Sequence, residues 1–204
     1  MAGIPQLPAD ARERLRQHFL EKPTDSHPSG WDDLYEQDFT PWDRGSPNPA
    51  LIETLSRKDL FDEPTVLSAK NTFSRRKRAL VPGCGRGYDV LLLAAFGYDA
   101  YGLEYSPRAV QEAKKVQAKI EEALGPDGKV KEGGPEEAKV YETRSTAIGR
   151  GKIHWVTGDF FKNVWVKQVE EIEGGRYDGG FELIYDYTVC LCLTCPSTVL
   201  ARHS

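Results

Sequence analysis

The 204-residue sequence lacks the features that mark several special classes of protein. Its 27 lysines and arginines face 31 aspartates and glutamates, and the formal net charge of -4 gives no electrostatic reason to expect nucleic acid as a partner. No apolar run approaches the ~20 residues that span a bilayer, so we expect no membrane partner. Four cysteines do not make a disulfide scaffold, and the N-terminus MAGIPQLPADARERLRQHF lacks a signal-peptide pattern. We therefore expect a reducing, cytoplasmic setting.

The pattern of apolar and polar residues predicts one α/β domain. Hydrophobic residues make up 39% of the sequence and charged residues 28%, as in soluble globular proteins that bury a real core. From residue 78 onward, short apolar segments alternate with helical ones, which is typical of a doubly wound, mostly parallel sheet. The expected strands are 78–81, 100–104, 153–156 and 181–185, and the expected helices include 10–20, 88–96 and 107–124.

Two polar segments interrupt this pattern. We interpret the basic run RRKR at 75–78 as a solvated lead-in to the first strand, with a localisation signal as the alternative. The Gly-rich, charged segment 125–151 is long for a connection in a compact domain. We expect it to be a flexible surface excursion or to carry its own helix around 136–142.

The stretch ALVPGCGRGYD places Gly83, Gly85 and Gly87 directly after the first expected strand. A glycine turn between a strand and a helix lets the backbone approach a ligand closely, and nucleotide-like ligands bind at the carboxyl ends of such strands. Glu104 ends the next strand, at a spacing that suits a carboxylate accepting both hydrogen bonds of a ribose diol. A tight turn plus a surface acid is the alternative. The strand context and the helix start at Ser106 favour a nucleotide site.

The glycine spacing separates two kinds of nucleotide ligand. The dinucleotide fingerprint G-x-G-x-x-G would need a glycine where Tyr88 stands, whereas G-x-G-x-G is the version seen in S-adenosylmethionine enzymes. Asp159 follows the third strand, the expected place for an acid near the adenine amine, with Phe160 against the ring. Asp159 can also cap the next segment, which is compatible with that role. These residues predict a class I S-adenosylmethionine-dependent methyltransferase with a Rossmann-like sheet.

The sequence resembles the thiopurine methyltransferase family, especially its plant and fungal thiol and halide methyltransferase branch. The signature is GWDDLYEQDFTPWDRGSPNPAL followed by LVPGCGRGYD, GLEYS, GDFF and FELIYDYT, within residues 30–188 apart from the insertion 125–151. The resemblance implies S-adenosylmethionine as cofactor, S-adenosylhomocysteine as product, and a small thiol or halide as acceptor. It implies these roles: Trp31 and Trp42 over the cofactor, Gly83 on its amino-acid part, Glu104 on the ribose, Asp159 and Phe160 beside the adenine, and Tyr187 where methyl group and acceptor meet.

Aromatic residues of the N-terminal segment suit a sulfonium ligand. A sulfonium is a cation without hydrogen-bond donors, so an aromatic face is a natural partner, worth ~0.5–2 kcal/mol. Trp31, Tyr35 and Trp42 therefore predict a lid that closes over the cofactor and excludes water. Their alternative role is that of ordinary core aromatics.

Methyl transfer from a sulfonium to a thiolate or halide is an in-line displacement. The enzyme mainly aligns donor and acceptor and desolvates the nucleophile, with a weak base at most. Asp186 and Tyr187 are the candidate catalytic residues, and each could hold or deprotonate an acceptor. Asp186 could instead cap the strand end. We interpret Cys84 as a small loop residue, because the reaction needs no covalent enzyme intermediate.

The family pattern stops after Thr188, where the chain reads VCLCLTCPSTVLARHS. We divide the chain into an N-terminal helical lid segment (1–60), a Rossmann-like cofactor-binding domain (61–188) and an atypical tail (189–204). We expect four strands where the fold of the family has seven, with the C-terminal strands missing, as a retained intron or a frame shift would cause. Three cysteines of the tail and His203 could suggest zinc, but we expect no metal site; they are Cys190, Cys192 and Cys195.

The sequence thus predicts a monomeric S-methyltransferase that acts on small thiols, with halides or hydrosulfide as further acceptors. Two alternatives stay open. One is a small-molecule methyltransferase of another acceptor class. The other is an inactive truncated chain that binds the cofactor or does not fold.

Overall fold

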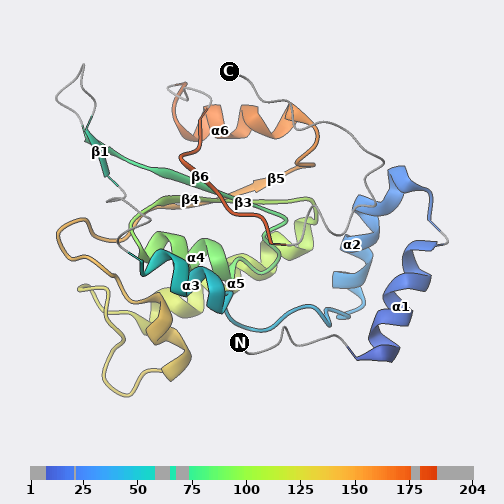
Figure 1. The fold of residues 1–204 in the computed structure, drawn as a ribbon, viewed down its shortest axis with the longest axis horizontal. Coiled ribbons are helices and arrows are strands. Elements are labelled where there is room, and N and C mark those ends of the chain that lie inside the picture. The colour runs from blue at the N-terminus through green and yellow to red at the C-terminus, as the bar shows by residue number, and fades with distance from the viewer. Residues whose placement is uncertain (1–7, 21, 58–64, 68–73, 176–179, 188–204) are drawn as a thin grey trace.

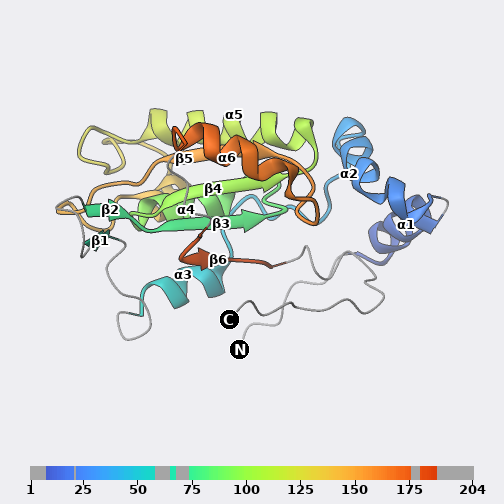
Figure 2. The same ribbon diagram turned by 90° about the horizontal axis from the view of Figure 1, so that it is seen from above.

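A four-stranded parallel sheet forms the centre of the protein. The computed structural model describes residues 8–20, 22–57, 65–67, 74–175 and 180–187. The strands lie in the order β5-β4-β3-β6, and all pairs are parallel (Figure 2). The predicted α/β fold with a parallel sheet is therefore confirmed. The strands are β3 (Arg78–Pro82), β4 (Asp99–Glu104), β5 (Ile153–Thr157) and β6 (Leu183–Ile184).

The direction in which strands are added reverses at β3. From β3 the chain moves outward through β4 to β5, and it then returns to the other side of β3 as β6. The chain thus leaves β3 toward one edge of the sheet and reaches β6 at the other edge. Where the order of neighbouring strands reverses in this way, a crevice forms at their carboxyl ends. This is the point of the sheet at which a ligand site is expected.

Helices cover both faces of the sheet (Figure 1). On one face lie α4 (Tyr88–Ala95) and α5 (Pro107–Ala123), and on the other lies α6 (Val166–Ile172). The short helix α3 (Pro49–Leu55) lies beside α4, and its leucines belong to the same buried cluster. A short 3₁₀ helix at Asn163–Trp165 leads into α6.

The core follows the period of two of a strand. Ala79 and Val81 of β3 pack into the cluster that includes α4, whereas Leu80 between them packs into the cluster under α6. Tyr101 and Leu103 of β4 belong to the second cluster as well. Because alternate side chains point to opposite faces, one short strand supplies both halves of the core.

The N-terminal helices lie beyond the carboxyl ends of the strands (Figures 1 and 2). They are α1 (Ala9–Leu20), which confirms the predicted helix, and α2 (His27–Glu36), joined through a single turn at Thr24–Ser26. The second helix begins at His27, and Pro28 is tolerated there because it lies in the first helical turn. The segment therefore stands over the crevice of the sheet.

The segment before β3 differs from the prediction of a polar connection. β1 (Thr65–Leu67) and β2 (Ser74–Arg76) pair as an antiparallel hairpin. Strands of three residues are too short to show a period of two in the sequence. The interpretation of the basic run as a solvated lead-in is wrong at Arg78, which is 3% exposed and whose backbone N–H donates to Glu182 (2.7 Å).

The predicted insertion at 125–151 packs onto the domain. It carries a 3₁₀ helix at Glu136–Tyr141, which confirms the expected helix around 136–142. Ala138 and Tyr141 of this helix are buried in the cluster with α4. An isolated bridge between Leu124 and Val130 closes the turn at its start. A flexible excursion therefore does not describe this segment.

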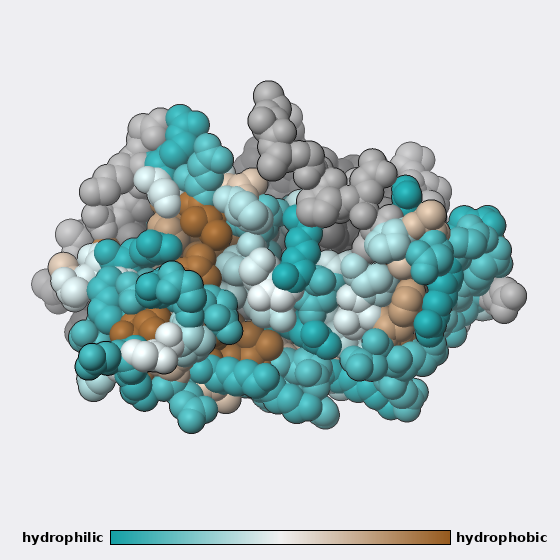
Figure 3. All heavy atoms as spheres, turned by 90° about the horizontal axis from the view of Figure 1, so that it is seen from below, coloured by the Kyte–Doolittle hydropathy of each residue, from teal (hydrophilic) through white to brown (hydrophobic). Residues whose placement is uncertain are grey.

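Within the described ranges, no helix is both long and apolar enough to cross a membrane. The same ranges contain no group of three or more His, Cys, Asp or Glu side chains arranged to hold a metal ion. The three tail cysteines and His203 lie outside the described residues, so the absence of a metal site there stays a prediction. The face in Figure 3 is mostly hydrophilic, and its hydrophobic residues gather in separate small groups.

Gly87 offers a test of how the turn into α4 is built. Its φ is +76°, and a Cβ atom there would lie 2.2 Å from Cη2 of Trp155, whose indole N–H is held by Gln117 (2.7 Å). Gly133 has a similar φ of +74° with nothing within 4 Å, so Gly133→Ala is the matched control. We expect Gly133→Ala to lower the free energy of unfolding by ~1–2 kcal/mol, the cost of a left-handed residue. Gly87→Ala should lose a further ~1–3 kcal/mol through overpacking. Urea denaturation measures both, and equal losses would contradict the packing argument.

Candidate active site

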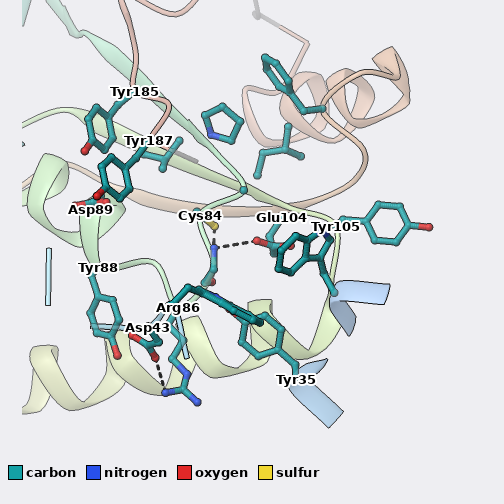
Figure 4. Close-up of a pocket in the computed structure, with 18 of the residues that line it drawn as sticks. Tyr35, Asp43, Cys84, Arg86, Tyr88, Asp89, Glu104, Tyr105, Tyr185 and Tyr187 are labelled. Atoms are coloured by element: carbon teal, nitrogen blue, oxygen red, sulfur yellow. Dashed lines mark hydrogen bonds and ion pairs between the residues drawn. The ribbon is translucent and has the colours of Figure 1, made fainter. Parts of the chain in front are cut away.

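A cavity of about 440 Å³ lies at the carboxyl ends of the four strands (Figure 4). Its wall combines the loops after β3, β4, β5 and β6 with α2 and the loop that follows it. The cavity therefore occupies the point where the strand order reverses. Most residues that the sequence singled out line it: Trp31, Tyr35, Trp42, Gly83, Gly85, Glu104, Asp159, Phe160 and Tyr187. Gly87 and Asp186 are not among the lining residues.

The three glycines divide between two tasks. Gly83 and Gly85 have φ values of +57° and +53° and bring bare backbone to the cavity wall. A Cβ atom on Gly85 would lie 3.1 Å from the Tyr35 hydroxyl, so the narrow space opposite this glycine suits a residue without a side chain. Gly87 instead caps α4 and packs under the Trp155 ring, away from the cavity. The sequence grouped all three because their spacing does not reveal what each one faces.

Glu104 is held in one orientation by backbone donors. Its side chain is 8% exposed, one carboxylate oxygen accepts from the Gly85 N–H (2.9 Å) and the other from the Ser106 N–H (3.0 Å). Burial raises the pKa of Glu104, and the backbone hydrogen bonds only partly offset that effect. The Tyr105 backbone acts on the same carboxylate, which has about four lone-pair positions in all. The backbone donors therefore leave part of its acceptor capacity for a ligand hydroxyl.

Aromatic rings form the wall opposite the glycine loop. Trp31 and Tyr35 come from α2 and Trp42 from the next loop, and all three line the cavity. The ring centroids of Trp31 and Trp42 lie 5.2 Å apart, and those of Tyr35 and Trp42 lie 6.0 Å apart, both edge to face. Burial and then the Glu104 charge raise the pKa of Tyr35, which keeps its hydroxyl neutral. The wall offers π faces and carries no charge.

The aromatic wall is attached to the sheet through Ser106. Its hydroxyl donates to Asp32 of α2 (2.5 Å) and accepts the Ala109 N–H as the N-cap of α5 (3.0 Å). Arg108 adds a backbone N–H (3.3 Å) and its guanidinium to the same Asp32 carboxylate. Although burial alone would raise the pKa of Asp32, the Ser106 and Arg108 donors together hold it below its ordinary value.

A second attachment joins the loop after α2 to the glycine loop. Arg86 donates to Asp43 (2.6 Å), and the other oxygen of Asp43 accepts from the Gly45 N–H (2.8 Å) (Figure 4). Both residues lie inside the motif segments PWDRG and GCGRG. Sequence reasoning missed the pair, because no local spacing relates two loops that are more than 40 positions apart.

Asp159 and Phe160 lie on the cavity wall after β5. One Asp159 oxygen accepts from the Phe161 N–H (3.0 Å), and the other lies 3.3 Å from the Lys162 ammonium. Asp159 thus closes a turn, the alternative that its sequence position allowed, and it faces the cavity at the same time. The two roles are compatible because only one carboxylate oxygen of Asp159 accepts the hydrogen bond that closes the turn.

Polar residues missed by the sequence gather near the end of β6. Arg44 donates to the Tyr187 hydroxyl (3.0 Å), and Asp89 accepts from the Asn48 N–H (2.8 Å). Figure 4 shows Asp89 beside Tyr187 and Tyr185. Burial raises the pKa of Asp89, and it raises the pKa of Tyr185 to about 12. Only Tyr187 of this group was predicted, since Arg44 and Asn48 come from the loop before α3 and Asp89 from the first turn of α4, far from β6 in sequence.

Parallel strands in this order, with a glycine loop after the first and a buried acid at the end of the second, make up the class I methyltransferase fold. The family can be stated more narrowly. The chain belongs to the thiopurine S-methyltransferase family, whose model matches residues 26–195. The match includes residues 189–195, which we expected to lie outside the family pattern.

Two curated plant proteins are similar to part of the chain. Probable thiol methyltransferase 2 of Arabidopsis thaliana is 31% identical over 107 residues, which are 52% of this chain and 41% of that protein. Thiocyanate methyltransferase 1 of Arabidopsis thaliana is 31% identical over 98 residues, 48% of this chain and 36% of that protein. The chain therefore covers less than half the length of these relatives.

One solved structure comes from work on the conversion of a disulfide bond into a thioacetal group during echinomycin biosynthesis. It matches with a TM-score of 0.45 at 20% identity and covers 80% of this chain and 47% of that one.

The attachment through Asp32 can be tested by removing its charge. Asp32→Asn should weaken the hydrogen bonds to Ser106 and Arg108 and lower the free energy of unfolding by about 1–3 kcal/mol. Proteolysis should also cut the segment 8–48 sooner. Asp33→Asn is the matched control, because Asp33 pairs with Lys22 (2.8 Å) inside the N-terminal segment itself. Similar protease sensitivity of the two variants would contradict a role for Asp32 in docking the segment.

Proposed function

We propose that the protein is an S-adenosylmethionine-dependent methyltransferase that moves a methyl group to a small thiol. Halides and hydrosulfide are further acceptors. The observation that carries the proposal is the convergence of a bare glycine backbone, the buried Glu104 carboxylate and an aromatic wall at one cavity. Membership of the thiopurine S-methyltransferase family and similarity to thiol and thiocyanate methyltransferases support it. We propose a monomer in the cytoplasm, without nucleic-acid or membrane partners.

The cavity fits the parts of this cofactor. The bare backbone of Gly83 and Gly85 would leave space for the amino-acid part, and the Glu104 carboxylate would accept from the ribose hydroxyls. Asp159 and Phe160 would flank the adenine. When bound, S-adenosylmethionine supplies a methyl group on a positively charged sulfur, and S-adenosylhomocysteine is left after transfer. The sulfonium would face Trp31, Tyr35 and Trp42, whose rings attract a cation without needing a hydrogen-bond donor.

The residues near β6 would hold the acceptor. A thiol with an ordinary pKa of ~8.5 is partly ionised near neutral pH, and the thiolate fraction can react. The new carbon–sulfur bond then forms as the methyl group leaves the sulfonium, without a covalent enzyme intermediate. The chain's contribution is alignment and exclusion of water. We propose that the Tyr187 hydroxyl contacts the acceptor and that Asp186, outside the wall, positions the strand end.

Titration with S-adenosylhomocysteine tests the cofactor site directly. Wild type should bind saturably, and Glu104→Gln should raise Kd about 10- to 100-fold through the loss of charge-assisted hydrogen bonds. Glu122→Gln, an exposed change of the same charge on α5, should leave Kd unchanged.

The pH dependence of this binding has a definite sign. Burial raises the pKa of Glu104, so the carboxylate is lost at a higher pH than an exposed glutamate as the solution is acidified. Affinity should therefore fall as pH falls through that raised pKa, because a protonated carboxyl no longer accepts both hydroxyls. Glu104→Gln should show a flat profile over the same range. A parallel decline in both proteins would assign the titration to another group.

Turnover separates an active enzyme from a chain that only binds the cofactor. With labelled S-adenosylmethionine, wild type should form a methyl thioether from 2-mercaptoethanol and no ether from ethylene glycol, as mass spectrometry can show. The rate should rise with pH toward the thiol pKa. Tyr187→Phe should lower kcat/KM about 10-fold if the hydroxyl contacts the acceptor. Binding of S-adenosylhomocysteine without product from any thiol or halide would instead favour the inactive, cofactor-binding alternative.

A further inference from the structure

Two arginines line the cavity from the loops around it, and among the residues of 8–187 that the structure describes, only Arg86 of the two has an ion-pair partner. Arg86 is paired with Asp43 at 2.6 Å, with Asp38 at 3.9 Å from the same guanidinium. Arg44 follows Asp43 in sequence and lines the same cavity. In the described part of the chain no ion pair includes Arg44, and the Tyr187 hydroxyl is its hydrogen-bond partner. Arg44 therefore places a positive charge at the β6 end of the cavity that no carboxylate of the described residues pairs with.

The contact between Arg44 and Tyr187 leaves donors for a ligand. Arg44 donates to the phenol oxygen at 3.0 Å, and its guanidinium lies 5.6 Å from the centre of the Tyr187 ring. A guanidinium has five N–H groups and no acceptor, and a phenol whose oxygen already accepts keeps its O–H free to donate. Tyr187 is 38% exposed, so that hydroxyl is open to solutes. The pair can offer two donors and one positive charge to the same small anion.

Asp89 is a carboxylate on which the charge of Arg44 acts. Its oxygen accepts from the Asn48 N–H at 2.8 Å. Burial raises the pKa of Asp89, while the Arg44 charge acts in the opposite direction. Tyr185 beside it has a pKa raised to about 12 and is neutral near pH 7. The positive charge of Arg44 is therefore not cancelled by a direct ion pair.

We propose that Arg44, together with the Tyr187 hydroxyl, is the specificity-determining site for the negative charge of the methyl acceptor. The acceptor then binds as an anion, a thiolate, hydrosulfide or halide, and not as a neutral thiol that is deprotonated later. This inference rests on the proposed function and assigns its acceptor chemistry to one residue. Arg44 comes from the same loop as Trp42, so one loop supplies both the aromatic wall and the anion site.

The kinetic signature follows from the charge balance of the step. An anion and a sulfonium react to give two neutral thioethers, or a neutral methyl halide and a thioether. Negative charge on the acceptor therefore declines toward the transition state, and Arg44 holds the bound anion more strongly than the transition state. Such an interaction lowers KM without raising kcat. The neutral product loses this attraction and leaves.

The test compares Arg44→Gln, Arg44→Lys and the control Arg144→Gln, an exposed charge in the segment 125–151. Binding is measured first and without turnover, from chloride NMR line broadening by protein saturated with S-adenosylhomocysteine, at constant ionic strength. Wild type and Arg144→Gln should broaden the signal, Arg44→Gln should lose the excess broadening, and Arg44→Lys should keep part of it. Equal broadening by wild type and Arg44→Gln would overturn the assignment.

Initial rates with iodide, followed as methyl iodide by gas chromatography, then give KM and kcat separately. Arg44→Gln should raise KM for iodide about 5- to 30-fold with kcat equal to or above that of wild type. A lower kcat at unchanged KM would overturn the anion role. Failure of wild type to bind S-adenosylhomocysteine would reject the proposed function itself. Normal S-adenosylhomocysteine binding with no effect of Arg44→Gln would reject only the Arg44 assignment.

Discussion

Glu104 lies where a charge is costly, at the end of a buried strand, and the cavity depends on how that cost is met. An ionised carboxylate out of water needs hydrogen-bond donors. The donors are backbone N–H groups of the glycine loop and of the turn into α5, at Gly85 and Ser106. Each donor fixes the loop that carries it. One carboxylate therefore links the glycine loop after β3 to the turn after β4.

Ser106 extends this arrangement to the N-terminal segment. The Ser106 N–H donates to Glu104 and its hydroxyl donates to Asp32, so the buried acid and the aromatic wall share one residue. The two ion pairs that attach the wall, Arg108 with Asp32 and Arg86 with Asp43, are partly exposed. Interactions of this kind are weaker than core packing and are screened by salt. Leu34 of α2, which is fully buried, adds an apolar contribution to the same attachment.

Sequence reasoning recovers features that depend on local order and misses those that depend on tertiary placement. Gly83, Gly85 and Glu104 follow strands, and parallel strands bring their carboxyl ends together, so their meeting was predictable. Gly87 shares the spacing but faces Trp155, which only the packing of β5 on α5 reveals. The ion pair of Arg86 with Asp43 joins loops that no periodic pattern connects. The hairpin before β3 was missed because three-residue strands show no periodicity.

Adjacent residues of one loop have opposite electrostatic tasks. Asp43 forms an ion pair with Arg86 and so attaches the loop to the glycine turn. Arg44 instead donates to the Tyr187 hydroxyl after β6. Because the ion pair of Asp43 holds the loop, the neighbouring Arg44 is held at a fixed position in the cavity. The rings of the aromatic wall are uncharged, whereas Arg44 brings a positive charge to the β6 end of the cavity. Under the proposed function, a cationic methyl donor at the wall and an anionic acceptor at Arg44 would lie at opposite ends of the cavity, which would favour approach along one line.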